Sequence, residues 1–124
     1  LAQALEKLEG VSVNYPLLES SPYHELAEKQ LSGKGGAILT IRTGSKERAY
    51  KLINHLKYVK IATNIGDVRT LVIHPASTIY IHSTPEAMEE AGVYDDTIRI
   101  SVGIEDIKDL IQDFTEAVES LGEE

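Results

Sequence analysis

The chain has 124 residues, of which 42% are hydrophobic, and this length is typical of one domain with its own core. Its formal net charge is −8 and its 12 Lys and Arg form no cluster, which argues against binding of nucleic acid through the phosphates. The absence of cysteine excludes disulfides and thiolate zinc sites, and no apolar run reaches the roughly 20 residues that a membrane helix needs.

The first third of the chain predicts a helix, a strand and a second helix. Residues 1–9 carry an apolar stripe at helical spacing, and residues 11–15 alternate apolar and polar side chains as a short strand does. Ser21 has the chemistry of a helix N-cap and Pro22 that of a first helical residue. We therefore expect the second helix to begin there and to end near Leu31.

The middle third predicts strands on either side of a helix. Residues 37–43 are rich in β-branched and apolar side chains, and Ser45 is placed to cap the helix that follows. Two further extended segments are expected at residues 59–61 and 69–74. Between them, residues 64–67 have the composition of a turn.

The last third predicts a short helix from Thr84 and Pro85, a strand over residues 97–102, and a final helix. Glu105 and Asp106 are expected in the first turn of that helix, where the helix dipole favours negative charge. Because helices intervene between the strands, the sequence predicts an α+β fold with a small, mainly antiparallel four-stranded sheet and helices packed on one face. The core stripe of the final helix consists of Ile107, Leu110, Ile111, Phe114, Val118 and Leu121.

Arg99 is the one cation of the strand at residues 97–102. The alternation places it on the polar face, beside the small side chains of Ser101 and Gly103. A guanidinium with room in front of it can bind a carboxylate through two parallel hydrogen bonds, although a surface arginine is in general a solvated one. The apolar residues of the alternation are Ile98, Ile100, Val102 and Ile104.

Other polar signals are weaker. His74 ends an apolar strand, which favours a structural role over acid–base chemistry. The glycine-rich residues 32–36 follow a helix and open a strand, so they indicate a turn and not a phosphate loop. The four histidines lack the spacing of a zinc motif, and no metal ligand is assigned.

Three segments resemble one family: residues 13–31 (VNYPLLESSPYHELAEKQL), 62–78 (ATNIGDVRTLVIHPAST) and 98–106 (IRISVGIED). They resemble the C-terminal domain of the Cys/Met-metabolism PLP-dependent enzymes, and within that family the O-acetylhomoserine sulfhydrylases, with cystathionine gamma-synthases and methionine gamma-lyases as relatives. The resemblance implies the same α+β fold. It also implies that residues 1–124 are the C-terminal small domain, and that the large domain with the Schiff-base lysine would lie N-terminal to Leu1.

The resemblance further implies which residues meet the substrate. Arg99 occupies the position that binds the α-carboxylate of the amino acid, and Asn64 the position beside it, although Asn64 also suits a plain turn. Ser77 and Thr78 are implied at the substrate entrance. Relatives often continue with Thr-His where this chain has Ile79-Tyr80, which puts the loop's contacts in doubt. No residue of this chain is implied as catalytic or cofactor-binding.

The function implied is the replacement of acetate in O-acetylhomoserine by sulfide or a thiol, in methionine and cysteine biosynthesis. The intact enzyme is expected to be a cytoplasmic homo-oligomer. Its large domain would hold pyridoxal 5'-phosphate. The chain alone would be inactive, bind no cofactor and expose the apolar surface that normally docks on that domain. Two alternatives remain open: a stand-alone amino-acid-binding or interaction domain, and one chain of a two-chain PLP enzyme. The sulfur donor and the choice between γ-replacement and γ-elimination also remain open.

Overall fold

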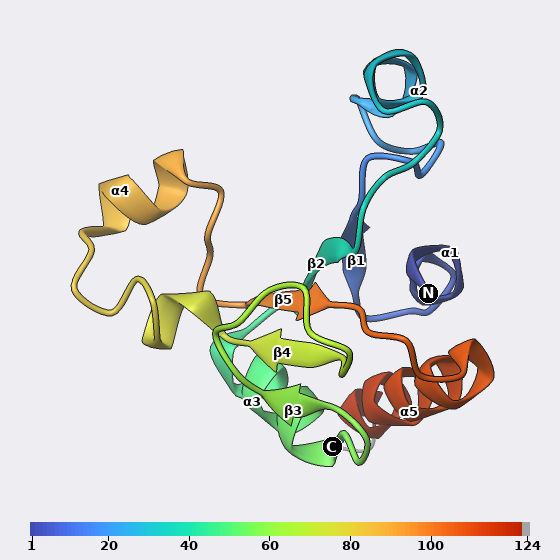
Figure 1. Ribbon diagram of the computed structural model, residues 1–124. Coiled ribbons are helices and arrows are strands. Elements are labelled where there is room, and N and C mark those ends of the chain that lie inside the picture. Colours follow the sequence, from blue (N-terminus) through green and yellow to red (C-terminus); the bar gives the residue numbers. More distant parts are fainter. Residues whose placement is uncertain (123–124) are drawn as a thin grey trace.

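A computed structural model of the chain describes residues 1–122 and shows five strands and five α-helices within them (Figure 1). The strands are β1 (Ser12–Asn14), β2 (Ile38–Arg42), β3 (Lys60–Ile61), β4 (Leu71–Ile73) and β5 (Thr97–Ser101). The helices are α1 (Ala2–Glu6), α2 (His24–Gln30), α3 (Lys46–His55), α4 (Pro85–Glu90) and α5 (Ile107–Glu119), with 3₁₀ turns η1 (Pro75–Ser77) and η2 (Ser120–Gly122).

The strands form one sheet in the order β1-β2-β5-β4-β3, so β5 is central and β1 and β3 are the edges. Three of the four pairings are antiparallel, and only β3 and β4 run parallel. The predicted α+β class with a mainly antiparallel sheet is confirmed. The sheet has five strands where four were expected, because the two-residue β3 adds an edge.

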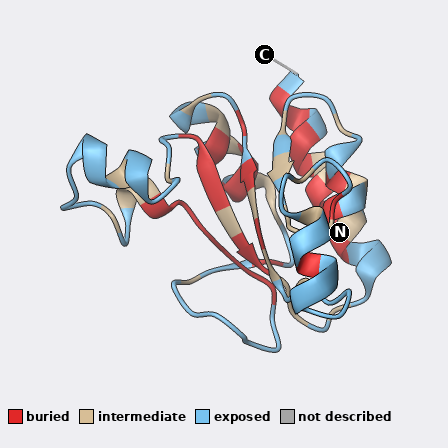
Figure 2. Ribbon diagram, turned by 90° about the horizontal axis from the view of Figure 1, so that it is seen from above, coloured by how far each residue is buried: buried red, intermediate tan, exposed pale blue. Residues whose placement is uncertain are grey.

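The core lies on one face of the sheet, where α1, α3 and α5 cover it (Figure 2). Leu5 of α1, Leu52 of α3 and Phe114 of α5 are fully buried there. They meet Ile41 of β2 and Ile100 of β5, which are equally inaccessible. Packing of helices on one face therefore agrees with the sequence for these three helices.

Two segments project from this layer, namely α2 and the stretch around α4 (Figure 1). No residue of α4 is buried, and only Ala27 of α2 is. Both segments present large apolar side chains to solvent. The most exposed are Tyr23, Leu26 and Leu31 around α2, and Ile79 and Ile81 before α4.

The predicted cap of α3 and the predicted start of α4 are confirmed. The hydroxyl of Ser45 accepts a hydrogen bond from the backbone N–H of Arg48 at 3.2 Å. The hydroxyl of Thr84 accepts one from the N–H of Ala87 at the same distance. Each bond satisfies an N–H that has no partner inside its helix.

The predicted start of α2 is wrong. The helix begins at His24 after Tyr23, not at Pro22. The hydroxyl of Ser21 accepts from the N–H of Tyr23, and the Ser21 carbonyl accepts from the N–H of His24. Ser21 therefore stabilises the turn that precedes the helix, because its side chain closes a two-residue loop instead of reaching the N–H of a first helical turn.

The start of α5 also differs in part. Asp106 is the N-cap, and its carboxylate accepts from the N–H of Lys108 at 2.8 Å. Glu105 lies before the helix and has other partners. Leu110, Phe114, Val118 and Leu121 of the apolar stripe are buried, whereas Ile111 is half-buried and Ile107 is 46% exposed. In the described part of the chain no helix has the length and apolar character needed to cross a membrane.

Arg48 ties three distant segments together. Its Nε donates to the carbonyl of Thr43 at 2.6 Å, and its two terminal nitrogens donate to the carbonyls of Leu121 and Gly10, each at 3.3 Å. One guanidinium thus joins the end of β2, the end of the α5 region and the turn before β1. The fork of a guanidinium suits this role because it aims several donors at once.

Candidate functional site

Arg99 lies in the middle of the central strand. Its neighbours in the chain, Ile98 and Ile100, belong to the core, so its side chain leaves the opposite face of β5. It pairs with Thr40 on β2 and with Ile73 on β4. The position on the face away from the core agrees with the sequence prediction.

The guanidinium of Arg99 is held by backbone carbonyls. Its Nη2 donates to the carbonyl of Thr63 at 2.8 Å and lies 3.4 Å from that of Asn64. Its Nε is buried and has no hydrogen-bond partner. None of the ion pairs formed by residues 1–122 includes Arg99. The side chain is thus a fixed positive charge with unused hydrogen-bonding capacity, and an unpaired buried donor of this kind is costly.

The sequence suggested open space beside Arg99, at Ser101 and Gly103, but in the structure a loop covers these two residues. The connection over residues 62–70 crosses this face of β5, and the buried hydroxyl of Ser101 accepts from the N–H of Gly66 at 3.2 Å. A Cβ on Gly103 would overlap backbone atoms of Val68 and Arg69. Small side chains on this strand therefore make room for the loop and not for a ligand.

Asn64 is brought to Arg99 by its backbone. Its side chain is exposed, and none of the hydrogen bonds found within residues 1–122 uses its amide. The expected turn is present, with Gly66 at a φ of +80°, which glycine adopts without strain. The amide is therefore available beside the guanidinium.

The hydroxyls of Ser77 and Thr78 form hydrogen bonds with His74. The Ser77 Oγ lies 2.7 Å from His74 Nδ1, and the Thr78 Oγ1 donates to the His74 carbonyl at 2.7 Å. His74 is 4% exposed, its Nε2 donates to the carbonyl of Asp95 at 2.5 Å, and its ring meets that of Tyr50 edge-on. These contacts fit a structural histidine. A role of Ser77 and Thr78 at a substrate entrance stays a prediction.

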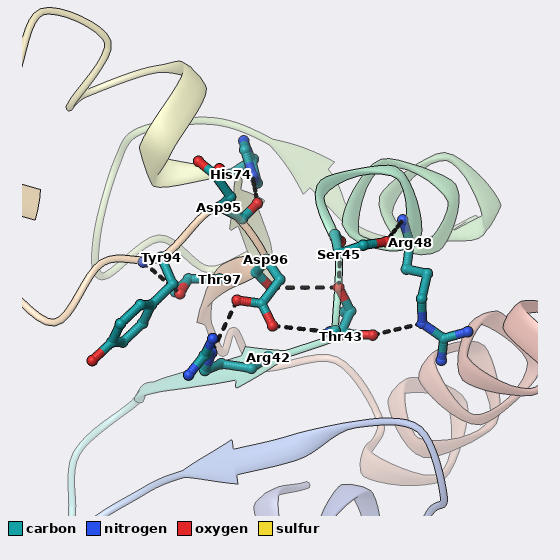
Figure 3. A network of polar contacts seen from close by, with 10 residues as sticks. Arg42, Thr43, Ser45, Arg48, His74, Tyr94, Asp95, Asp96 and Thr97 are labelled. Carbon is teal, nitrogen blue, oxygen red and sulfur yellow. Dashed lines mark hydrogen bonds and ion pairs between the residues drawn. The ribbon is translucent and has the colours of Figure 1, made fainter. Parts of the chain in front are cut away.

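Sequence reasoning missed a polar network at the junction of β2 and β5 (Figure 3). The Asp96 carboxylate accepts from Arg42 Nε and from the N–H of Gly44, both at 2.9 Å, and Tyr94 lies under the Arg42 guanidinium at 4.0 Å. Burial raises the pKa of Asp96, but the N–H of Gly44 and the Arg42 guanidinium outweigh it, so the pKa lies below its ordinary value. Residues 54 apart in sequence meet here, and only the strand register brings them together.

The described residues do not fit a Schiff-base site for pyridoxal phosphate. Such a lysine is normally desolvated in a pocket, which favours its neutral form. Seven of the eight lysines are exposed, and Lys51 is only half-buried. None of the lysines in the described chain therefore has the surroundings of a Schiff-base lysine.

Comparison with known proteins gives the family. The profile of the Cys/Met metabolism PLP-dependent enzymes matches residues 1–119. The chain belongs to this family. The resemblance of the three sequence segments is thereby confirmed.

Similar proteins with assigned activities include O-acetyl-L-homoserine sulfhydrylase 1 of Thermus thermophilus, 43% identical over 92% of this chain and 27% of its own length. The homocysteine synthase of Schizosaccharomyces pombe is 45% identical over 96% of this chain and 28% of its own length. The chain thus spans less than a third of these relatives.

A solved structure shares the fold. The chain superposes with a TM-score of 0.87 and 34% identity on a Campylobacter jejuni protein described as an O-acetylhomoserine (thiol)-lyase, covering 95% of this chain and 28% of that one. That crystal structure contains N'-pyridoxyl-lysine-5'-monophosphate. The relatives are therefore PLP-dependent enzymes, of which this chain corresponds to a part.

Proposed function

We propose that this chain is the C-terminal small domain of a PLP-dependent O-acetylhomoserine sulfhydrylase, where Arg99 and Asn64 bind the α-carboxylate of the substrate. The observation that carries the proposal is the state of Arg99. Its Nη2 is fixed by two backbone carbonyls at an exposed position, and none of the ion pairs within residues 1–122 uses its charge. A carboxylate supplies the charge and the acceptor oxygens that such a group lacks.

Asn64 is the second donor in this proposal. Its exposed amide lies on the loop that touches the Arg99 guanidinium, so an N–H from each residue can meet one carboxylate. Ser77 and Thr78 shape the entrance and do not bind, because their hydroxyls already serve His74. This division of roles leaves the chain with binding residues and no catalytic residue.

The chemistry belongs to a cofactor held elsewhere. Pyridoxal phosphate supplies an electron sink when it is bound, and the protein fixes the orientation of the substrate. Holding the carboxylate sets which bond of the amino acid faces the cofactor, and orientation of this kind is worth several kcal/mol of barrier. We infer that a large domain outside residues 1–124 holds the cofactor, in a cytoplasmic homo-oligomer.

A chimera tests the proposal. The chain replaces the corresponding segment of the Thermus thermophilus O-acetyl-L-homoserine sulfhydrylase 1, and Arg99→Lys is compared with the parent chimera. We expect KM for O-acetyl-L-homoserine to rise at least about tenfold, because lysine lacks the two-pronged geometry. The cofactor absorbance stays unchanged.

Arg69→Lys is the matched control, because Arg69 is exposed and its charge is kept. An unchanged KM in Arg99→Lys removes the assigned role. Calorimetry of the isolated chain with O-acetyl-L-homoserine adds a second measurement. Tight binding there would favour a stand-alone amino-acid-binding domain over an enzyme segment that lacks most of its pocket.

A further inference from the structure

The loop over residues 62–70, which carries Asn64, is fastened to the segment after β5 by one half-buried carboxylate, that of Glu105. We propose that Glu105 and Thr70 are positioning residues that hold this loop against Arg99. The inference rests on the proposed function, since it assigns these residues to the same carboxylate-binding site. Neither residue touches the substrate in this scheme.

Thr70 and Glu105 form a closed arrangement of hydrogen bonds. The Thr70 N–H donates to Glu105 Oε2 and the Thr70 hydroxyl donates to Glu105 Oε1, each at 2.8 Å. The same hydroxyl accepts from the N–H of Gly103 at 2.9 Å. Thr70 is fully buried, so its N–H and its hydroxyl depend on these partners and not on water.

Further hydrogen bonds attach the rest of the loop, from Val68 to Thr63, to the segment that begins at Arg99. The N–H of Ile104 donates to the carbonyl of Val68 at 2.9 Å, and the N–H of Gly66 donates to the hydroxyl of Ser101 at 3.2 Å. At the far end the carbonyl of Thr63 accepts from the guanidinium. The loop is thus fastened to residues 99–105 at four points along its length.

Apolar burial does not hold the loop in place. Ile65 is 62% exposed and Val68 is 65% exposed, and residues 63–69 are all exposed. A segment with few buried contacts opens locally at low cost unless its hydrogen bonds are strong. The Glu105 carboxylate supplies charge-assisted bonds at the point where the loop enters β4.

The pKa of Glu105 is consistent with this role. Burial raises it, but the N–H and hydroxyl of Thr70 and the charge of Arg69 outweigh burial and leave the pKa below its ordinary value. The carboxylate is therefore ionised at neutral pH, which makes both hydrogen bonds from Thr70 charge-assisted. Its position before Asp106, the N-cap of α5, frees it from a capping role.

The test combines a structural and a kinetic measurement. In the 124-residue chain, Glu105→Gln and Thr70→Val are expected to speed amide exchange at Gly66 and Thr70 by about tenfold, while the core amide of Ile100 is unchanged. In the chimera the same variants are expected to raise KM for O-acetyl-L-homoserine about fivefold, with kcat within twofold. Thr70→Ser keeps the hydroxyl, so its amide exchange rates and its KM should equal those of the parent protein.

Glu89→Gln on the exposed α4 is the matched control and should change neither value. If the loop amides of Glu105→Gln and Thr70→Val exchange at the parent rate, the inference is overturned. It is also overturned if KM rises in Arg99→Lys but not in these two variants, and the proposed function then stands. If KM is unchanged in Arg99→Lys itself, the proposed function fails, and the positioning role fails with it.

Discussion

Arg42 and Arg99 lie diagonally on the same face of the β2–β5 pair, but only Arg42 meets a carboxylate. Arg99 pairs with Thr40, and Arg42 pairs with Thr97, two residues along each strand. Arg42 donates to Asp96 at 2.9 Å, whereas Arg99 has only carbonyl partners in the described chain. Two like charges on one face thus have different partners: Arg42 binds a carboxylate, and Arg99 binds backbone carbonyls only.

The Arg42–Asp96 pair predicts a pH-dependent contribution to stability. Asp96→Asn removes the charge and turns one of the two acceptor oxygens into an NH₂ group, so either the Gly44 N–H or the Arg42 guanidinium loses its acceptor, which is expected to cost about 1–3 kcal/mol at pH 7. Because the folded pKa is below the unfolded value of 3.8, the contribution is full above that pH and is lost as pH falls through the folded pKa. Urea unfolding at pH 7 and pH 3 measures it.

The matched control for this pair is Asp95→Asn, since Asp95 is exposed and only its carbonyl is engaged. The gap in unfolding free energy between parent and Asp96→Asn should narrow at pH 3. A gap that stays constant with pH would contradict the lowered pKa of Asp96.

The Gly103 position predicts intolerance of any side chain. Gly103→Ala places a Cβ against the backbone at Val68 and Arg69, which cannot move aside as a flexible side chain would. We expect a loss of about 1–3 kcal/mol in unfolding free energy. Gly122→Ala is the control, because a Cβ there meets nothing within 4 Å. Equal stabilities of the two variants would show that the loop can withdraw from β5.

Arg48 predicts a large effect from a change that keeps the charge. Arg48→Lys retains one donor group but cannot reach the carbonyls of Thr43, Leu121 and Gly10 together, and a cost of about 1–3 kcal/mol follows. The melting temperatures of Arg48→Lys and Arg69→Lys are compared. A larger drop for Arg48→Lys shows that the three hydrogen bonds matter, and not arginine as such. The same melting temperature for both would argue that the three bonds add nothing.

Two residues of the apolar stripe of α5, Phe114 and Ile107, are expected to differ strongly in how much their replacement lowers the unfolding free energy. Phe114→Ala empties a fully buried site and is expected to cost about 3–5 kcal/mol. Ile107→Ala, at a site 46% exposed, should cost less than about 1 kcal/mol. Urea unfolding of both variants measures the contrast. Comparable losses would mean that Ile107 is covered in solution, for example by a second copy of the chain.

Local patterns in the sequence were sufficient for most elements. Apolar alternation placed Arg99 on the face away from the core, and the side chains of Ser45 and Thr84 marked the starts of α3 and α4. These features depend on residues within one turn or one strand. They could therefore be predicted without knowing how the strands pair.

The details of the site could not be predicted in this way. Ser101 and Gly103 looked like room for a ligand, but they accommodate the loop over residues 62–70. The bond between Arg42 and Asp96 joins residues 54 apart. Such contacts follow from strand register and from the path of a loop across a sheet, and no local pattern encodes either. The prediction that Ser21 is an N-cap was wrong for a different reason, because a turn and an N-cap use the same side-chain chemistry.

The short edges of the sheet limit how copies of this chain can join. β1 has three residues and is followed by Pro16, and β3 has only two, one of them the exposed Lys60. Edges this short, with a lysine or a proline close by, offer few free N–H and C=O groups to an incoming strand. Edge-to-edge pairing of two copies through their strands is thereby disfavoured.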